Sequence, residues 1–142
     1  MSRIVVPAEM KRYEDLENDD GTVVRYRRHD NGGGLVGAGA HAAPDAYVAA
    51  TAWVDPGAHV NAGAHLGDHV WLERGAVVHT GARLGSHVHV EADAVVGAGA
   101  RLGTRVTVGA GARVEPGVVV HSDQTIPAGA LVRRSASRSV AA

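Results

Sequence analysis

The sequence predicts an all-β fold, a solenoid of short stacked strands, and three observations support this prediction. Residues 36–132 follow a repeat of six residues that never slips. The first position of the repeat holds a branched aliphatic residue at sixteen of its seventeen occurrences. The fifth position holds only Ala or Val, apart from Gln124, and the fourth is mostly Gly. A short fixed period indicates repeats that bury their apolar sides only by stacking on their neighbours.

A second period of eighteen residues lies over the period of six. A residue other than Gly recurs at the fourth position every eighteen residues, at Thr51, His69, His87, Arg105 and Asp123. One corner in three therefore differs, so three repeats make one coil and residues 36–132 make about five coils. Two protonated imidazoles stacked at His69 and His87 would repel. The column therefore predicts a pH-sensitive seam or an anion site including Arg105, or else a corner whose turn does not require Gly.

This pattern resembles the hexapeptide-repeat family, whose members form left-handed parallel β-helices with three repeats per triangular coil. The resemblance covers about two thirds of the chain. It implies a left-handed parallel β-helix and, because family members are typically trimers, a homotrimer. Two branches of the family bear on function: acyltransferases and γ-carbonic anhydrases.

Three segments are expected along the chain. Residues 1–35 lack the repeat and form an irregular N-terminal capping segment, because a solenoid needs its open end covered. Within it, residues 22–28 alternate enough to predict a strand. Residues 36–132 form the β-helix, and residues 133–142 form a flexible tail rich in Ser, Ala and Arg.

Composition narrows the classes of function. The net charge is -1, so no bulk attraction to nucleic acid or to an anionic membrane is expected. There is no Cys, which excludes disulfides and thiolate chemistry. Nothing resembles a signal peptide or a membrane-spanning segment, so the sequence predicts a soluble, cytoplasmic protein.

Residues eighteen apart should stack directly, which aligns outward side chains in columns. The largest apolar column contains Trp53, Trp71 and His89, with the acidic residues Asp55, Glu73 and Glu91 beside it on the same face. An exposed aromatic patch usually marks a contact surface. We expect the column to pack under the N-terminal segment, or to meet another subunit or a ligand.

Histidines offer two kinds of chemistry. The resemblance to γ-carbonic anhydrases implies a zinc site between subunits of a trimer, in which His79 matches one ligand. Ala92 and Gly97 stand where the other two ligands belong, so the family zinc site is expected to be incomplete. A metal site improvised from His59 and His79 across a trimer interface stays open, since neutral imidazoles are good ligands.

The resemblance to acyltransferases implies a histidine general base at a subunit interface. His79 is the first candidate for this base, followed by His89, His59 and His121. No loop interrupts the repeats to enclose a pantetheine arm, which argues against an enzyme. The sequence therefore favours a non-catalytic scaffold or binding module, with no cofactor expected. The alternatives are an acyltransferase that uses coenzyme A with His79 as base, and a divergent zinc protein like γ-carbonic anhydrase; the small-molecule or protein partner is not specified.

Overall fold

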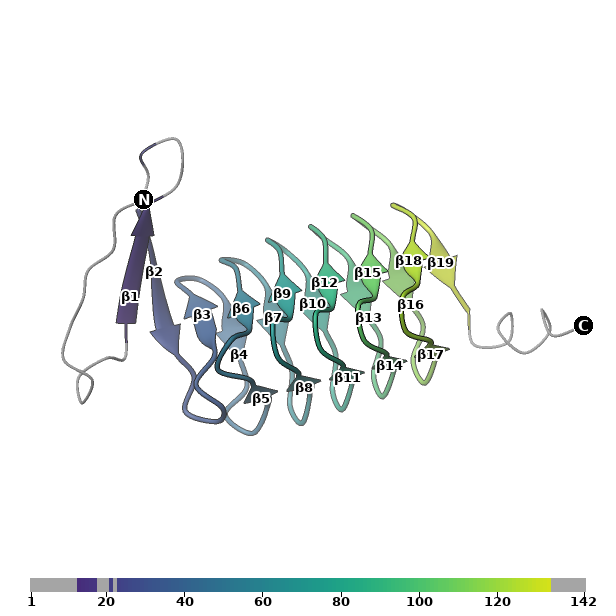
Figure 1. Ribbon diagram of the computed structural model, residues 1–142, viewed down its shortest axis with the longest axis horizontal. Coiled ribbons are helices and arrows are strands. Elements are labelled where there is room, and N and C mark those ends of the chain that lie inside the picture. Colours follow the sequence, from purple (N-terminus) through teal and green to yellow (C-terminus); the bar gives the residue numbers. More distant parts are fainter. Residues whose placement is uncertain (1–12, 18–20, 22, 134–142) are drawn as a thin grey trace, which may run out of the picture.

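The computed structural model describes residues 13–17, 21 and 23–133, and within them all regular structure is β-strand. Figure 1 shows short strands stacked in successive coils along the long axis of the molecule, with β1 and β2 at the N-terminal end. No helix among the described residues is long and apolar enough to span a membrane. The predicted all-β solenoid is confirmed.

Three longer strands come first, and two-residue strands follow at every repeat. The longer strands are β1 (Tyr13–Glu17), β2 (Val23–Arg28) and β3 (Leu35–Gly37). The two-residue strands are β4 (His41–Ala42), β5 (Tyr47–Val48), β6 (Trp53–Val54), β7 (His59–Val60), β8 (His65–Leu66), β9 (Trp71–Leu72), β10 (Val77–Val78), β11 (Arg83–Leu84), β12 (His89–Val90), β13 (Val95–Val96), β14 (Arg101–Leu102), β15 (Thr107–Val108), β16 (Arg113–Val114), β17 (Val119–Val120), β18 (Thr125–Ile126) and β19 (Leu131–Val132).

The coils are triangular because the strands fall into three sheets. The sheets have the orders β1-β2-β3-β6-β9-β12-β15-β18, β19-β16-β13-β10-β7-β4 and β17-β14-β11-β8-β5. Within the coils each strand pairs in parallel with the strand eighteen residues later, as Trp71 does with His89 and Leu66 with Leu84. The predicted stacking of residues eighteen apart is therefore confirmed on all three faces.

The core is a continuous column of the first and fifth repeat positions. First-position side chains such as Leu66, Leu72 and Val90 are fully buried, and so are fifth-position residues such as Ala76 and Val88. Burial is less complete at the two ends of the column: Ala40 is half-buried at the N-terminal end, and Gln124 is exposed and Val132 half-buried at the C-terminal end. A dry interior this narrow excludes charged or bulky polar groups at these positions.

Most corners hold residues at positive φ, and the distinct corner does so at every position after Thr51. His69, His87, Arg105 and Asp123 have φ of 59°, 62°, 58° and 67°, and Asp93 adopts 62° at another corner. These values match those of the corner glycines, for example 69° at Gly99. At these four residues the turn has the same left-handed conformation as at the glycine corners, and it accepts other side chains at a steric cost that Gly avoids.

The N-terminal strands extend one sheet beyond the first coil. β2 pairs antiparallel with β3, placing Tyr26 opposite Gly37, and β1 pairs antiparallel with β2. The strand predicted at residues 22–28 is confirmed as β2. The flexible tail predicted for residues 133–142 lies outside the described residues from 134 onward, and the division of the chain at residue 35 stays a prediction.

The loop between β2 and β3 binds to the end of the first coil. His29 Nε2 lies 2.9 Å from the carbonyl oxygen of Ala43, and its side chain is buried. Asn31 Nδ2 donates to the Ala46 carbonyl at 3.1 Å, and the Gly34 amide donates to the Val48 carbonyl at 2.9 Å. These bonds satisfy backbone groups that the end of a solenoid would otherwise leave unpaired.

Candidate functional site

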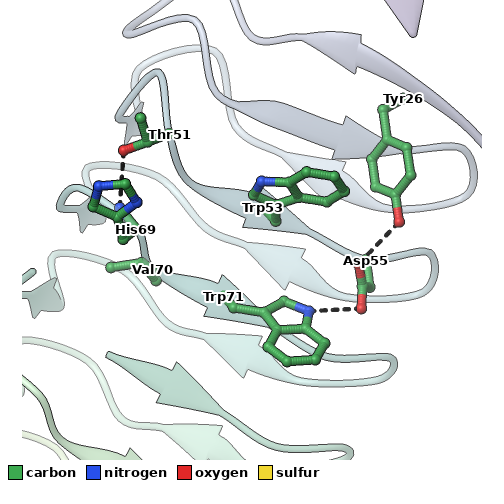
Figure 2. Close-up of a pocket in the computed structure, with 7 residues that line it drawn as sticks. All are labelled: Tyr26, Thr51, Trp53, Asp55, His69, Val70 and Trp71. Carbon is green, nitrogen blue, oxygen red and sulfur yellow. Dashed lines mark hydrogen bonds between the residues drawn. The ribbon is translucent and has the colours of Figure 1, made fainter. Parts of the chain in front are cut away.

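The face that carries the tryptophans contains a cleft between β2 and the first coils. Its volume is about 450 Å³. Figure 2 shows that the side chains around it come from β2, from the strands β6 and β9, from the corners that precede those two strands and from the residue that follows β6. The lining residues are Tyr26, Thr51, Trp53, Asp55, His69, Val70 and Trp71.

Asp55 holds the polar side of the cleft together. The Tyr26 hydroxyl donates to Oδ1 of Asp55 at 3.0 Å, and Nε1 of Trp71 donates to Oδ2 at 2.8 Å (Figure 2). The Tyr26 ring is buried and packs edge-on against Trp53, with ring centroids 5.2 Å apart and planes at 66°. Burial, and secondly the Asp55 carboxylate, raises the pKa of Tyr26 above its usual range, so the hydroxyl remains a donor.

The second tryptophan is the exposed platform of this face. The Trp71 side chain is 43% exposed, and its indole lies flat against the imidazole of His89, with ring centroids 4.3 Å apart and planes at 4°. The indole is therefore fixed by a hydrogen bond at its edge and by stacking on one face. The column expected to pack under the N-terminal segment does so at Trp53, while Trp71 stays open to solvent.

His89 is held by a carboxylate. Its Nε2 forms a short contact with Oε2 of Glu73, and both side chains are about two-thirds buried. With the proton on Nε2, the contact becomes a hydrogen bond to Glu73 and leaves a lone pair on Nδ1. Nδ1 has no hydrogen-bond partner within the described part of the chain. A carboxylate that orients an imidazole and stabilises its protonated form is the arrangement that general bases use.

His79 lies on a different face and has a neutral partner. It follows β10, is exposed, and its Nδ1 lies 3.3 Å from Nδ2 of Asn61 in the coil before. It stands at the edge of a second cleft of about 420 Å³, to which Arg113 and the apolar side chains of Val95 and Leu131 contribute. An amide can orient the ring, but it cannot stabilise an imidazolium as a carboxylate does.

The side chains of the distinct corner form two pairs, one of stacked rings and one of opposite charges. The rings of His69 and His87 stack with centroids 4.7 Å apart, and Nε and Nη2 of Arg105 bind the two carboxylate oxygens of Asp123 at 2.5 and 3.1 Å. Hydrogen bonding to Asp123 raises the pKa of Arg105, and hydrogen bonding to Arg105 lowers the pKa of Asp123. Because the guanidinium is engaged by Asp123, the anion site expected at this column has no free Arg105 fork to bind an anion.

The two histidines suggested as metal ligands do not meet within the chain. His59 stacks near His41, with ring centroids 6.0 Å apart, whereas His79 stands beside Asn61. Among the described residues no three His, Asp or Glu side chains are grouped to hold a metal ion. A site shared by two subunits stays a prediction.

The sequence predicted which face carries most residues of this site, but it did not predict the contacts between them. Trp53, Trp71, His89 and the adjacent carboxylates were assigned to one face, and the structure brings them together there. Tyr26 was missed as a site residue. The sequence did contain an indication of its role. Tyr26 lies in a strand with alternating polarity, and a strand that covers an apolar column is expected to turn an aromatic residue inward.

Two solved structures similar to this chain are N-acetyltransferases. A histidine-to-alanine mutant of GDP-perosamine N-acetyl transferase from Caulobacter crescentus, in complex with CoA and GDP-perosamine, superposes with a TM-score of 0.68 at 32% identity. The histidine-to-asparagine mutant of perosamine N-acetyltransferase from the same organism, also with CoA and GDP-perosamine, gives 0.67 at 31%.

Each match covers 70% of this chain and 47% of the other, so the chain spans about half the length of these proteins. No protein-family profile matches the chain, and no curated protein sequence does. The likeness extends over most of the repeat region, and it agrees with the eighteen-residue coils and the three parallel sheets. The chain belongs to the hexapeptide-repeat family of left-handed parallel β-helices.

Proposed function

We propose that this chain is an acyltransferase of the hexapeptide-repeat type that moves an acyl group from coenzyme A to an amine. The observation that carries the proposal is the similarity to two N-acetyltransferases at over 30% identity, both in complex with CoA. The sequence favours a scaffold because no loop interrupts the repeats. The similarity to these two enzymes supports the alternative.

The best-supported base in this proposal is His89, which ranks second to His79 on sequence alone. Its partner Glu73 is charged, whereas the partner of His79 is the neutral side chain of Asn61. In the reaction, the amine nitrogen attacks the thioester carbonyl carbon and a C–N bond forms. His89 Nδ1 takes the proton that the nitrogen gives up. The C–S bond then breaks, and the leaving thiolate receives that proton to give the free thiol.

Assembly as a homotrimer is part of the proposal. Both clefts of the single chain are open to solvent, and acyl transfer needs water excluded from the thioester. A neighbouring subunit seated against one of these faces would supply the missing wall, because a cyclic interface repeats the same contact around the axis. The oligomeric mass in solution checks this part separately.

The test is release of free thiol from acetyl-coenzyme A in the presence of a panel of amines, amino sugars included. The chain has no Cys, so a thiol reagent sees only the product. We expect His89→Asn to lower kcat/KM by about 10²–10⁴-fold, and His79→Asn to serve as the matched control with a much smaller loss. Glu73→Gln should also lower kcat/KM, because an amide can orient the imidazole but cannot stabilise its protonated form as a carboxylate does.

Three results would refute the proposal in different ways. No coenzyme A binding and no thiol release by the unaltered protein would return the scaffold function to first place. Activity lost in His79→Asn and kept in His89→Asn would leave the reaction class intact but move the base to the second cleft. Activity that requires added zinc would favour a metal site between subunits.

A further inference from the structure

The aromatic cleft has a chemical character that acyl transfer does not account for. It lies on the opposite side of the Trp71 indole from His89, because that ring stacks on His89 with one face and lines the cleft as well. We propose that this cleft binds an organic cation, a primary or methylated ammonium group on a small skeleton. The inference goes beyond the proposed function and holds whether or not the chain transfers acyl groups.

Charge is the first argument. Asp55 is the only residue with a fixed charge among those that line the cleft, and no Lys or Arg is among them. An anion such as a phosphate of coenzyme A would meet a carboxylate here with no compensating cation, which disfavours it. A cation would meet Asp55 and three aromatic rings, those of Tyr26, Trp53 and Trp71.

Aromatic faces are the second argument. An ammonium group within about 6 Å of an indole centroid is attracted by the negative face of the ring, and Trp is the best of the aromatic residues for this contact. Trp53 and Trp71 are paired in register in adjacent coils, yet their rings are not stacked on one another among the described ring contacts. Figure 2 shows the two indoles one above the other with the opening between them and the corner residues Thr51 and His69.

Preorganisation is the third argument. Trp71 is fixed by Asp55 and by His89, and Trp53 is fixed by the edge-on contact with Tyr26. The rings therefore lose little conformational entropy when a ligand binds, which is the main cost of using mobile aromatic residues. Tyr26, Asp55 and Trp71 form one hydrogen-bonded set, so the carboxylate is also held at a fixed place beside the indole faces.

The carboxylate distinguishes a cation from a neutral sugar. Each oxygen of Asp55 already accepts one hydrogen bond from the protein, from Tyr26 or from Trp71. This reduces the capacity left for a network of sugar hydroxyls, whereas the attraction of an ammonium group for the negative charge does not depend on a free lone pair. The cleft is therefore better matched to charge than to hydroxyl geometry.

The sequence supplies its own probe for the experiment. The chain contains two Trp, and both line the cleft, so intrinsic tryptophan fluorescence and the two indole N–H resonances report on this site alone. The full chain is titrated at constant ionic strength with choline and with 3,3-dimethyl-1-butanol, which has the same shape without the charge. Glucosamine and glucose form a second charged and neutral pair.

We expect choline to change the tryptophan fluorescence in a saturable way, with a Kd on the order of 1 mM. The neutral alcohol should bind about tenfold more weakly. Asp55→Asn should weaken the binding of choline about tenfold and leave the affinity for the neutral alcohol unchanged. Glu91→Gln is the matched control, because Glu91 occupies the same place in the same column two coils away and bonds the Ala110 amide. It should change neither titration.

Equal affinity for choline and the neutral alcohol in the unaltered protein would overturn the proposal, and so would the absence of saturation with either. That comparison needs no variant, so it stands even if Asp55→Asn fails to fold. Tighter binding of glucose than of glucosamine would also overturn it, in favour of a sugar site. Acyl transfer is measured separately by thiol release, so failure of one proposal does not imply failure of the other.

Discussion

Two nearby glycines offer a test of what limits the sequence of a stacked coil: Gly97 directly after β13, and Gly99 at the following corner. Gly99 has a φ of 69°, and a Cβ added there would meet nothing within 4 Å. Gly97 does not have positive φ, but a Cβ there would lie 2.5 Å from the Pro116 nitrogen and 2.7 Å from the Val114 carbonyl oxygen. The first position is limited by backbone conformation and the second by the next coil.

The magnitudes follow from these two causes. Gly99→Ala places a side chain in the left-handed region, which costs about 1–2 kcal/mol, partly offset by about 0.4–1 kcal/mol of reduced entropy in the unfolded chain. The net loss is therefore about 0–1.6 kcal/mol. Gly97→Ala forces backbone atoms of adjacent coils apart, and overpacking against a well-packed neighbour costs about 1–3 kcal/mol before any ladder hydrogen bond is broken. The hydrogen bond that the Gly97 amide donates to the Val114 carbonyl oxygen, 2.7 Å long, would be the first to weaken.

The assay is chemical denaturation of both variants beside the unaltered protein, followed by far-ultraviolet circular dichroism. We expect the midpoint to fall clearly further for Gly97→Ala than for Gly99→Ala. Gly111→Ala is the matched control for conformation alone, because it also has a φ of 69° and open space around its Cβ. A loss at Gly99 equal to or greater than that at Gly97 would refute the reasoning, since it would mean that positive φ and not coil spacing sets the limit.

Three further perturbations have defined outcomes. Leu84→Asp should abolish folding, because an unpaired charge would enter the dry core where Leu84 is 1% exposed; soluble protein with a cooperative melt would contradict the register. Stability should fall as pH rises above about 10, because the raised pKa keeps Tyr26 protonated in the folded chain while the unfolded chain ionises; Tyr26→Phe should flatten that decline in melting temperature. His87→Gly should leave the melting temperature unchanged or raise it, since it releases left-handed strain at 62°; a marked drop would show that the stack on His69 stabilises the corner.

The fold could be predicted from the sequence because the repeat fixes burial and stacking at once. Val90 and Leu72 are inward because they occupy the first position, and they are neighbours because they are eighteen apart. The same arithmetic placed Trp71 and His89 in one outward column. It could not give the backbone conformation of the distinct corner, because a period tells where a residue lies but not which φ it adopts, and His87 adopts one that usually selects Gly.

The contacts of the site could not be predicted, because they depend on side-chain direction across coils. Trp71 bonds Asp55 and His89 bonds Glu73, and each pair is separated by sixteen residues. These are the same contact made one coil apart: a residue just before the buried strand residue reaches a carboxylate just after the buried residue of the preceding coil. Once this spacing is known, the partner of any such ring can be looked for sixteen residues earlier.

The same rule explains why Trp53 behaves differently. Sixteen residues before it stands Gly37, where a Cβ would lie 2.8 Å from Cδ and 2.9 Å from the nitrogen of Pro56. No carboxylate fits at that place without moving the next coil, so Trp53 has no partner of the kind that fixes Trp71. It is packed against Tyr26 of β2 instead, with the planes at 66°. The cleft therefore opens where the regular contact is sterically forbidden, and the N-terminal strand supplies the wall that the repeat cannot.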